Sequence, residues 1–241
     1  MKDFRPSSLW DYRTCPYKFK YDVWWEKNIV ILWFWDIVHS ACRWLDMSKF
    51  LDYYIQNYNP DYKILKIYNK ILNEAYEWYK KNKDNIILSE AKMVMKFLWE
   101  EIAWTPDAVM KEWDDYIVID FKTSATHSFY EKEDIWNESM QCLIYPLMVM
   151  KYYWINKCKF RYVVFSKANG KVREYEKEVE WDNAMALVED VIEKYKFSEE
   201  TDEWDCKVSR MCFMCPLKKN YTCPVYINKK PKDGESNKCK N

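Results

Sequence analysis

The sequence predicts an α/β protein in which a mixed central β-sheet is flanked by helices. The chain has 241 residues and is 49% hydrophobic, so it can bury a core of ordinary size. The spacing of its apolar residues indicates helix, helix, three strands, helix, two strands and helix in that order. The length suits one substantial domain, or one domain with a small appendage.

In the first half of the chain, apolar residues recur first at helical spacing and then with the alternation typical of strands. Residues 6–20 indicate a short helix that breaks near Cys15-Pro16. Apolar residues return at helical spacing from Phe34 and again after Asp61. Strand-like patterns then cover residues 86–97, 101–110 and 116–123.

The second half of the chain returns to helix before a hairpin. We expect a helix over residues 131–151 and two strands, 159–167 and 171–179, joined around Asn169-Gly170. A last helix is predicted over residues 181–195.

Charge and hydropathy exclude several functional classes. Lys+Arg 38 balances Asp+Glu 38, so a uniformly basic coat for nucleic acid is excluded, although a local basic groove is not. The longest uncharged apolar run, Ile29 to Trp35, is seven residues, where a membrane helix needs about 20. The N-terminus has no apolar secretion signal, so we expect a cytoplasmic protein.

Two carboxylates and a lysine form the most informative pattern. In the strand 116–123, Asp120 and Lys122 share one face because side chains alternate along a strand. Pairing with the preceding strand brings Asp107 close to Asp120. Two neighbouring carboxylates repel each other unless a cation lies between them, and oxygen ligands suit Mg²⁺ or Mn²⁺. The alternative is a hairpin with an ordinary surface ion pair.

Three weaker signals accompany this pattern. Gln141 and Tyr145 are four residues apart in a predicted helix and therefore project from one face. His39 lies on the helix that begins near Phe34, and Glu90 lies on the first predicted strand. By itself each of these residues is more typical of packing than of chemistry.

Nine cysteines in a chain without an export signal indicate metal binding rather than disulfides. Two ligand sets are open. Four local residues could form a zinc knuckle: Cys206, Cys212, Cys215 and Cys223. Alternatively, Cys15 joins the last three around an iron–sulfur cluster, which needs four thiolates and tolerates a distant one. Cys42, Cys142 and Cys158 fall in periodic segments and are expected in the core.

Five motifs follow one another along the chain: Cys15-Pro-Tyr-Lys-Phe-Lys-Tyr, His39, Thr-Pro-Asp107, Asp120-Phe-Lys122-Thr and Gln141-x-x-x-Tyr145. In this order, and with the cysteine set, they resemble the PD-(D/E)XK nuclease superfamily. The most similar branch is that of the RecB-like exonucleases, which includes the CRISPR-associated RecB-type exonucleases and the nuclease domain of AddB. The resemblance runs from Ser7 to Cys223, and Pro146, directly after Tyr145, departs from it.

The resemblance implies a restriction-endonuclease-like core and a function. It assigns His39, Asp107 and Asp120 as ligands of Mg²⁺ or Mn²⁺, and Lys122 as the residue that orients the attacking water. Gln141 and Tyr145 would position the DNA and the lysine, and Glu90 is a possible extra acid. The implied activity is a DNA exonuclease on single-stranded ends, in CRISPR adaptation, recombination or phage replication. The alternatives are a non-catalytic DNA- or partner-binding module and a zinc-stabilised endonuclease.

The resemblance also implies a domain organisation. Residues 1–227 would form one nuclease domain, in which a [4Fe–4S] cluster on Cys15, Cys212, Cys215 and Cys223 staples the segment 206–223 to the N-terminus. Residues 228–241 contain five lysines and no apolar periodicity, so we expect a flexible basic tail.

Glycine is almost missing from the chain. It occurs twice, where average usage of about 7% predicts roughly 17, whereas tryptophan occurs 14 times. In the resembling family, glycines stand at the positions of Trp35, Trp104 and Trp113, and Trp99 and Trp154 lie where turns favour glycine. We hypothesise that these codons are UGA, read as glycine in the source and translated here as tryptophan. The alternative is a genuinely tryptophan-rich protein.

Overall fold

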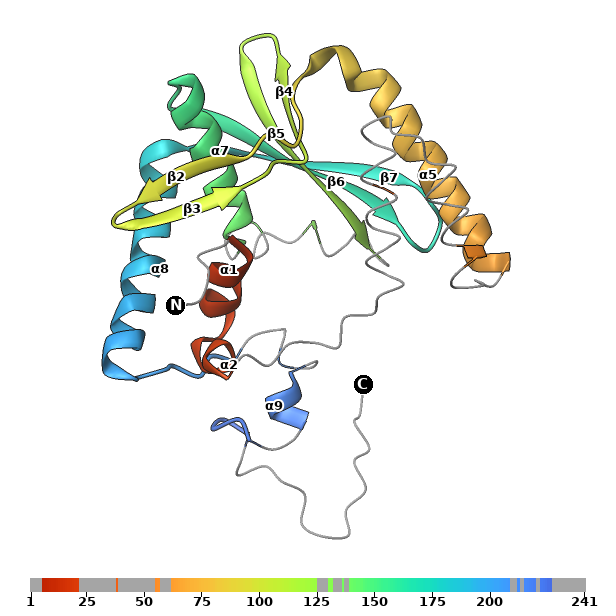
Figure 1. Ribbon diagram of the computed structural model, residues 1–241. Coiled ribbons are helices and arrows are strands. Elements are labelled where there is room, and N and C mark those ends of the chain that lie inside the picture. The colour runs from red at the N-terminus through yellow and green to blue at the C-terminus, as the bar shows by residue number, and fades with distance from the viewer. Residues whose placement is uncertain are drawn as a thin grey trace, which may run out of the picture.

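The computed structural model (Figure 1) describes most of the chain beyond residue 61. The described residues are 6–21, 38, 55–56, 62–124, 130–131, 136, 139–208, 212, 215–219 and 222–226. The predictions for His39, for Trp35, for most of the helix from Phe34 and for the tail 228–241 lie outside these residues.

A five-stranded mixed sheet forms the centre of the molecule and confirms the predicted fold class. Its strand order is β1-β4-β5-β6-β7, in which β5 and β6 are parallel and every other pair is antiparallel. The strands are β1 (Ile86–Leu88), β4 (Ala108–Glu112), β5 (Asp115–Ser124), β6 (Lys157–Ser166) and β7 (Val172–Glu180). This arrangement is compatible with a restriction-endonuclease-like core.

A separate two-stranded hairpin corrects part of the strand prediction. The expected strands 86–97 and 101–110 are each divided, so that β2 (Met93–Phe97) pairs with β3 (Glu100–Trp104) apart from β1 and β4. The divisions fall at residues 89–92 and 105–107, where Glu90 has a left-handed backbone and Pro106 has no N–H for a ladder. The hairpin therefore leaves the plane of the main sheet.

Helices cover both faces of the sheet (Figure 1). The helix α5 (Tyr62–Asn82), followed by the short 3₁₀ turn η1 (Lys83–Asn85), packs its buried face against apolar side chains of β5 and β6. On the opposite face, α7 (Gln141–Tyr153) and α8 (Trp181–Thr201) pack with the β2–β3 hairpin in a second core cluster. The α7 helix runs through Pro146. Alternation along β5 sends Ile119 and Phe121 towards α5 and Val118 towards α7.

The N-terminal segment lies against the C-terminal one. The predicted break at Cys15-Pro16 separates α1 (Pro6–Thr14) from α2 (Pro16–Lys20). The backbone N–H of Tyr17 donates to the carbonyl of Asp205 at 2.9 Å, and the Tyr12 hydroxyl lies 3.1 Å from that of Ser198. The short helix α9 (Pro216–Lys219) follows in the cysteine-rich segment. These contacts join residues 12–17 to the end of α8 and the residues that follow it.

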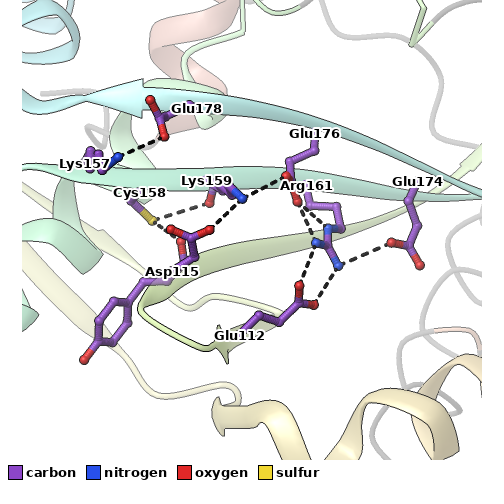
Figure 2. A network of polar contacts seen from close by, with 10 residues as sticks. Glu112, Asp115, Lys157, Cys158, Lys159, Arg161, Glu174, Glu176 and Glu178 are labelled. Carbon is purple, nitrogen blue, oxygen red and sulfur yellow. Dashed lines mark hydrogen bonds and ion pairs between the residues drawn. The ribbon is translucent and has the colours of Figure 1, made fainter.

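Charged side chains link β6 to its neighbours on the sheet face shown in Figure 2. Arg161 is only 12% exposed and forms ion pairs with Glu112, Glu174 and Glu176. Lys159 pairs with Asp115 at 2.7 Å, and this contact lowers the pKa of the Asp115 carboxyl. These ion pairs favour one alignment of β4, β6 and β7.

No helix among the described residues is both long enough and apolar enough to cross a membrane.

Candidate active site

Strand β5 presents a carboxylate and an ammonium group side by side in its C-terminal half. Asp120 and Lys122 point to the face that carries α7, and their Oδ2 and Nζ atoms are 2.6 Å apart. Asp120 is 5% exposed, so its carboxylate has lost most of its hydration. A buried charge of this kind requires a close partner of opposite sign, which Lys122 provides.

Asp107 lies directly beside this pair. Ala108 is opposite Ile119 in the antiparallel register of β4 and β5, so Asp107 comes next to Asp120. The Asp107 Oδ2 atom accepts the backbone N–H of Phe121 at 2.8 Å, which fixes the carboxylate against β5. The Ser89 hydroxyl donates to the Asp107 carbonyl at 3.1 Å. The structure thus brings together the two carboxylates and the lysine of the sequence prediction.

The two carboxylates control the charge of Lys122. Burial by itself lowers the pKa of a lysine, but the negative charges of Asp120 and Asp107 outweigh it, so the pKa of Lys122 is raised. Lys122 is therefore an ammonium at neutral pH, a hydrogen-bond donor rather than a base.

Gln141 and Tyr145 lie on one face of α7, with the Gln141 Nε2 atom donating to the Tyr145 hydroxyl at 2.7 Å. The Tyr145 ring stacks on that of Trp104, with centroids 3.6 Å apart and an interplanar angle of 13°. Burial raises the pKa of Tyr145, and the charges of Asp120 and Asp107 raise it further. Both carboxylates therefore lie within electrostatic reach of this face of α7.

Glu90 is placed next to Asp107 through its backbone. Its N–H donates to the carbonyl of Pro106 at 3.0 Å, while its side chain is exposed. The role of Glu90 as an extra acid stays a prediction. That of His39 concerns a residue outside the described part of the chain.

The sequence did not indicate the aromatic residues beneath the site. Tyr162 on β6 is opposite Asp120 in the parallel register, and its ring lies under the Lys122 ammonium. Cys142, which was expected in the core, is buried there and also contacts Tyr162. A tyrosine in a predicted buried strand looks like an ordinary core residue, so Tyr162 could be placed beside Lys122 only once the pairing of β5 with β6 was known.

The carboxylates suit a divalent cation by their chemistry. Mg²⁺ is commonly bound by one or two carboxylates, with waters and substrate phosphates completing its shell. Asp120 on β5 and Asp107, directly before β4, provide two such groups on adjacent inner strands of the sheet, and a cation there would also offset their mutual repulsion. Within the described ranges, no group of three or more His, Cys, Asp or Glu side chains is arranged to hold an ion.

The cysteine-rich segment forms a second candidate site. Five thiols line one small cavity between the chain ends: Cys15, Cys206, Cys212, Cys215 and Cys223. The Sγ atoms of Cys206 and Cys223 are 3.3 Å apart. Burial, with the neighbouring sulfurs of Cys223 and Cys15, raises the pKa of Cys206 to about 12. Thiolates are the ligands of both iron–sulfur clusters and structural zinc, and the residues that line the cavity include both predicted ligand sets. No three of these five described thiols are, however, arranged to hold an ion.

Comparison with known proteins supports the fold. No protein-family model matches the chain, and no curated protein matches its sequence. A solved structure of a "putative exonuclease" from Eubacterium rectale has 13% sequence identity and a TM-score of 0.53, and the match covers 89% of this chain and 94% of that one. The structure of SSO0001 has 16% identity and a TM-score of 0.41 over 93% of this chain and 86% of that one. At 13% identity the similarity to the Eubacterium rectale protein concerns the fold alone.

Proposed function

We propose that this chain is a metal-dependent DNA exonuclease of the PD-(D/E)XK superfamily, from its RecB-like branch. The observation that carries the proposal is the placement of Asp107, Asp120 and Lys122 side by side on two adjacent strands. An ordinary ion pair requires one carboxylate beside the lysine, whereas a divalent cation that activates water for phosphodiester hydrolysis is commonly held by more than one carboxylate. The fold shared with the Eubacterium rectale protein is consistent with a nuclease.

The residues of the site have different roles in the proposed reaction. A divalent cation held by Asp107 and Asp120 would supply an activated water and would neutralise charge on the phosphate. Lys122, kept protonated by the two carboxylates, donates a hydrogen bond to that water or to a phosphate oxygen. Gln141, which donates a hydrogen bond to Tyr145 on the same face of α7, positions the DNA strand.

We further propose single-stranded ends as the substrate and a role in CRISPR adaptation, recombination or phage replication. In this proposal residues 1–227 act as one domain, and an iron–sulfur cluster on Cys15, Cys212, Cys215 and Cys223 has a structural role. The cavity between the chain ends supports this part, because it contains Cys15 together with the three distant cysteines.

The test compares two aspartates of the same strand. Asp120→Asn should reduce Mn²⁺-dependent degradation of end-labelled single-stranded DNA by at least about 100-fold, because it removes a ligand charge with little change of shape. Asp115→Asn, at the opposite end of β5, is the matched control and should stay within about twofold of the wild type. Circular single-stranded DNA, which has no ends, should resist the wild-type protein.

Two outcomes would contradict the proposal. If Asp120→Asn cleaves as fast as the wild type, the assigned site is wrong. If the wild type binds single-stranded DNA but does not cleave it with Mg²⁺ or Mn²⁺, the chain is a non-catalytic binding module.

A further inference from the structure

The ring of Tyr162 lies beneath the lysine of the proposed nuclease site. Tyr162 is on β6, opposite Asp120 in the parallel pair with β5, and is 2% exposed. The Lys122 Nζ atom is 5.9 Å from the centroid of the Tyr162 ring. This distance falls within the range in which the negative face of an aromatic ring attracts an ammonium.

Two hydrogen-bonding contacts fix the Tyr162 hydroxyl from the side of α7. The Ser139 Oγ atom lies 3.1 Å from the hydroxyl oxygen, and the Cys142 thiol donates to it at 3.1 Å. Because burial raises the pKa of Tyr162 far above its usual value, the hydroxyl remains protonated. The far end of the side chain is therefore held in place.

Three further aromatic rings restrict the orientation of Tyr162. Tyr130 lies with its centroid 5.1 Å away at an interplanar angle of 61°, Trp136 lies 5.1 Å away at 48°, and Phe160 lies 4.8 Å away at 85°. These contacts are close and are not parallel stacks, so rotation of the Tyr162 ring would collide with its neighbours. The ring consequently presents a fixed face to Lys122.

Lys122 requires a second attractive group because Asp120 has two roles in the proposed site. Its Oδ2 atom forms the ion pair with Lys122, and the proposed function assigns the same carboxylate to a cation. When Asp120 shares its charge with a cation, its hold on the ammonium weakens. The attraction of the Tyr162 ring does not depend on Asp120 and keeps the ammonium near the attacking water.

We propose that Tyr162 is a positioning residue, which holds the Lys122 ammonium in the geometry required for hydrolysis. The proposal rests on the proposed nuclease function. In this proposal the face of the Tyr162 ring attracts the ammonium, whereas the hydroxyl only holds the ring in place.

Cleavage kinetics on single-stranded DNA distinguish the contribution of the Tyr162 ring from that of its hydroxyl and from a general loss of core packing. Tyr162→Leu removes the ring and should lower kcat about tenfold with KM nearly unchanged, because Lys122 is misplaced while DNA still binds. Tyr162→Phe keeps the ring and should retain kcat within about threefold. The control Phe165→Leu removes a buried ring of similar size from the opposite face of β6 and should leave kcat within about twofold. Equal kcat losses in Tyr162→Leu and Phe165→Leu would overturn the proposal.

A second series removes the risk that the leucine variant fails to fold. Phenylalanine carrying one, two or three fluorines at position 162 keeps the volume while the negative potential of the ring face falls. We expect log kcat to decrease with each fluorine at constant KM, and a flat series would contradict the proposal.

A measurement without substrate or metal separates this proposal from the nuclease function. With ¹³C-labelled lysine, the ε-methylene signal of Lys122 should show an upfield ring-current shift that Tyr162→Phe preserves and Tyr162→Leu removes. If the shift is present and DNA is never cleaved, the proposed function fails while the geometry holds. If the shift is missing from the wild type, the ring does not hold the lysine.

Discussion

At the scale of single residues, Trp113 and Trp154 have a backbone conformation that tryptophan rarely adopts. Their φ angles are 56° and 57°, in the left-handed region that favours glycine, and their side chains are 96% and 92% exposed. Trp113 begins the turn between β4 and β5, and Trp154 ends α7 as its left-handed cap. Neither ring is buried enough to offset the strain.

The other suspected positions differ from these two. The Trp104 ring stacks on Tyr145 beside the site, so it packs as a real side chain does. In the β2–β3 turn, Leu98 rather than Trp99 has the positive φ angle. The structure therefore favours glycine at Trp113 and Trp154, gives no steric reason for it at Trp104, and leaves Trp35 outside the described residues.

We predict that Trp113→Gly and Trp154→Gly together stabilise the protein by about 1 kcal/mol. Each change relieves a left-handed strain of roughly 1–2 kcal/mol, and glycine returns about 0.5–1 kcal/mol of this through its greater freedom in the unfolded chain. Urea unfolding measures the difference.

The control is Trp99→Gly, at an exposed turn position without a left-handed backbone, which should give no gain. A double variant that is less stable than the parent would contradict the prediction. UGG codons at positions 113 and 154 in the source gene would independently exclude recoding.

At the scale of elements, two local hairpins were predictable, whereas the β2–β3 hairpin and the pairing of distant strands were not. The hairpin that joins Asp107 to Asp120 follows from adjacent strand patterns, and so does the hairpin around Gly170. The parallel pairing of β5 with β6 has no local signal, because no short sequence pattern reveals the register of two strands that a helix separates. For this reason the carboxylates and Lys122 were found from the sequence and Tyr162 was missed.

Arg161 on β6 joins this strand to β4 and β7 through its three ion pairs. We predict that Arg161→Met lowers the free energy of unfolding by about 1–3 kcal/mol, because Glu112, Glu174 and Glu176 then repel one another without their central cation. The figure is below that of a fully buried ion pair because the three glutamates are each about one-third exposed.

Two controls define this effect in urea unfolding experiments. Lys157→Met, which breaks the exposed pair with Glu178, should cost no more than about 0.5 kcal/mol. Adding Glu176→Gln to Arg161→Met should restore part of the loss, since one repelling charge is removed. An Arg161→Met variant as stable as the parent would show that the ion pairs do not stabilise the sheet.

At the scale of the whole molecule, residues from near both ends of the described chain line the cavity that contains the cysteines. Cys15 precedes α2, while Cys215 and Cys223 flank α9, and all three are buried. A metal centre there would close a loop that contains both core clusters and the proposed nuclease site. Its loss should therefore affect the entire fold rather than one segment.

We predict that Cys15→Ala lowers the thermal midpoint as much as Cys215→Ala, because either change opens the same closure. Cys206→Ala should have a much smaller effect if the centre is the proposed iron–sulfur cluster. Protein purified without oxygen should then be brown, with a broad absorbance near ~400 nm from thiolate-bound iron.

A zinc knuckle gives the opposite pattern. The protein would be colourless with one equivalent of zinc, Cys206→Ala would be as harmful as Cys215→Ala, and Cys15→Ala would be tolerated. The close approach of Cys206 to Cys223 makes this comparison necessary.

The parallel pair β5–β6 also determines when during synthesis the site is complete. A parallel neighbour can join only after the crossover that connects it, and α7 with the residues before it forms that crossover. Chains emerge from the ribosome N-terminus first, so Asp107, Asp120 and Lys122 leave the exit tunnel before β6 does. A nascent chain that stops before β6 has the acids and the lysine but neither the partner strand of β5 nor the ring beneath the lysine. We therefore expect the proposed nuclease activity to be absent on the ribosome until β6 docks, which would separate the translation of this protein from any cleavage of DNA.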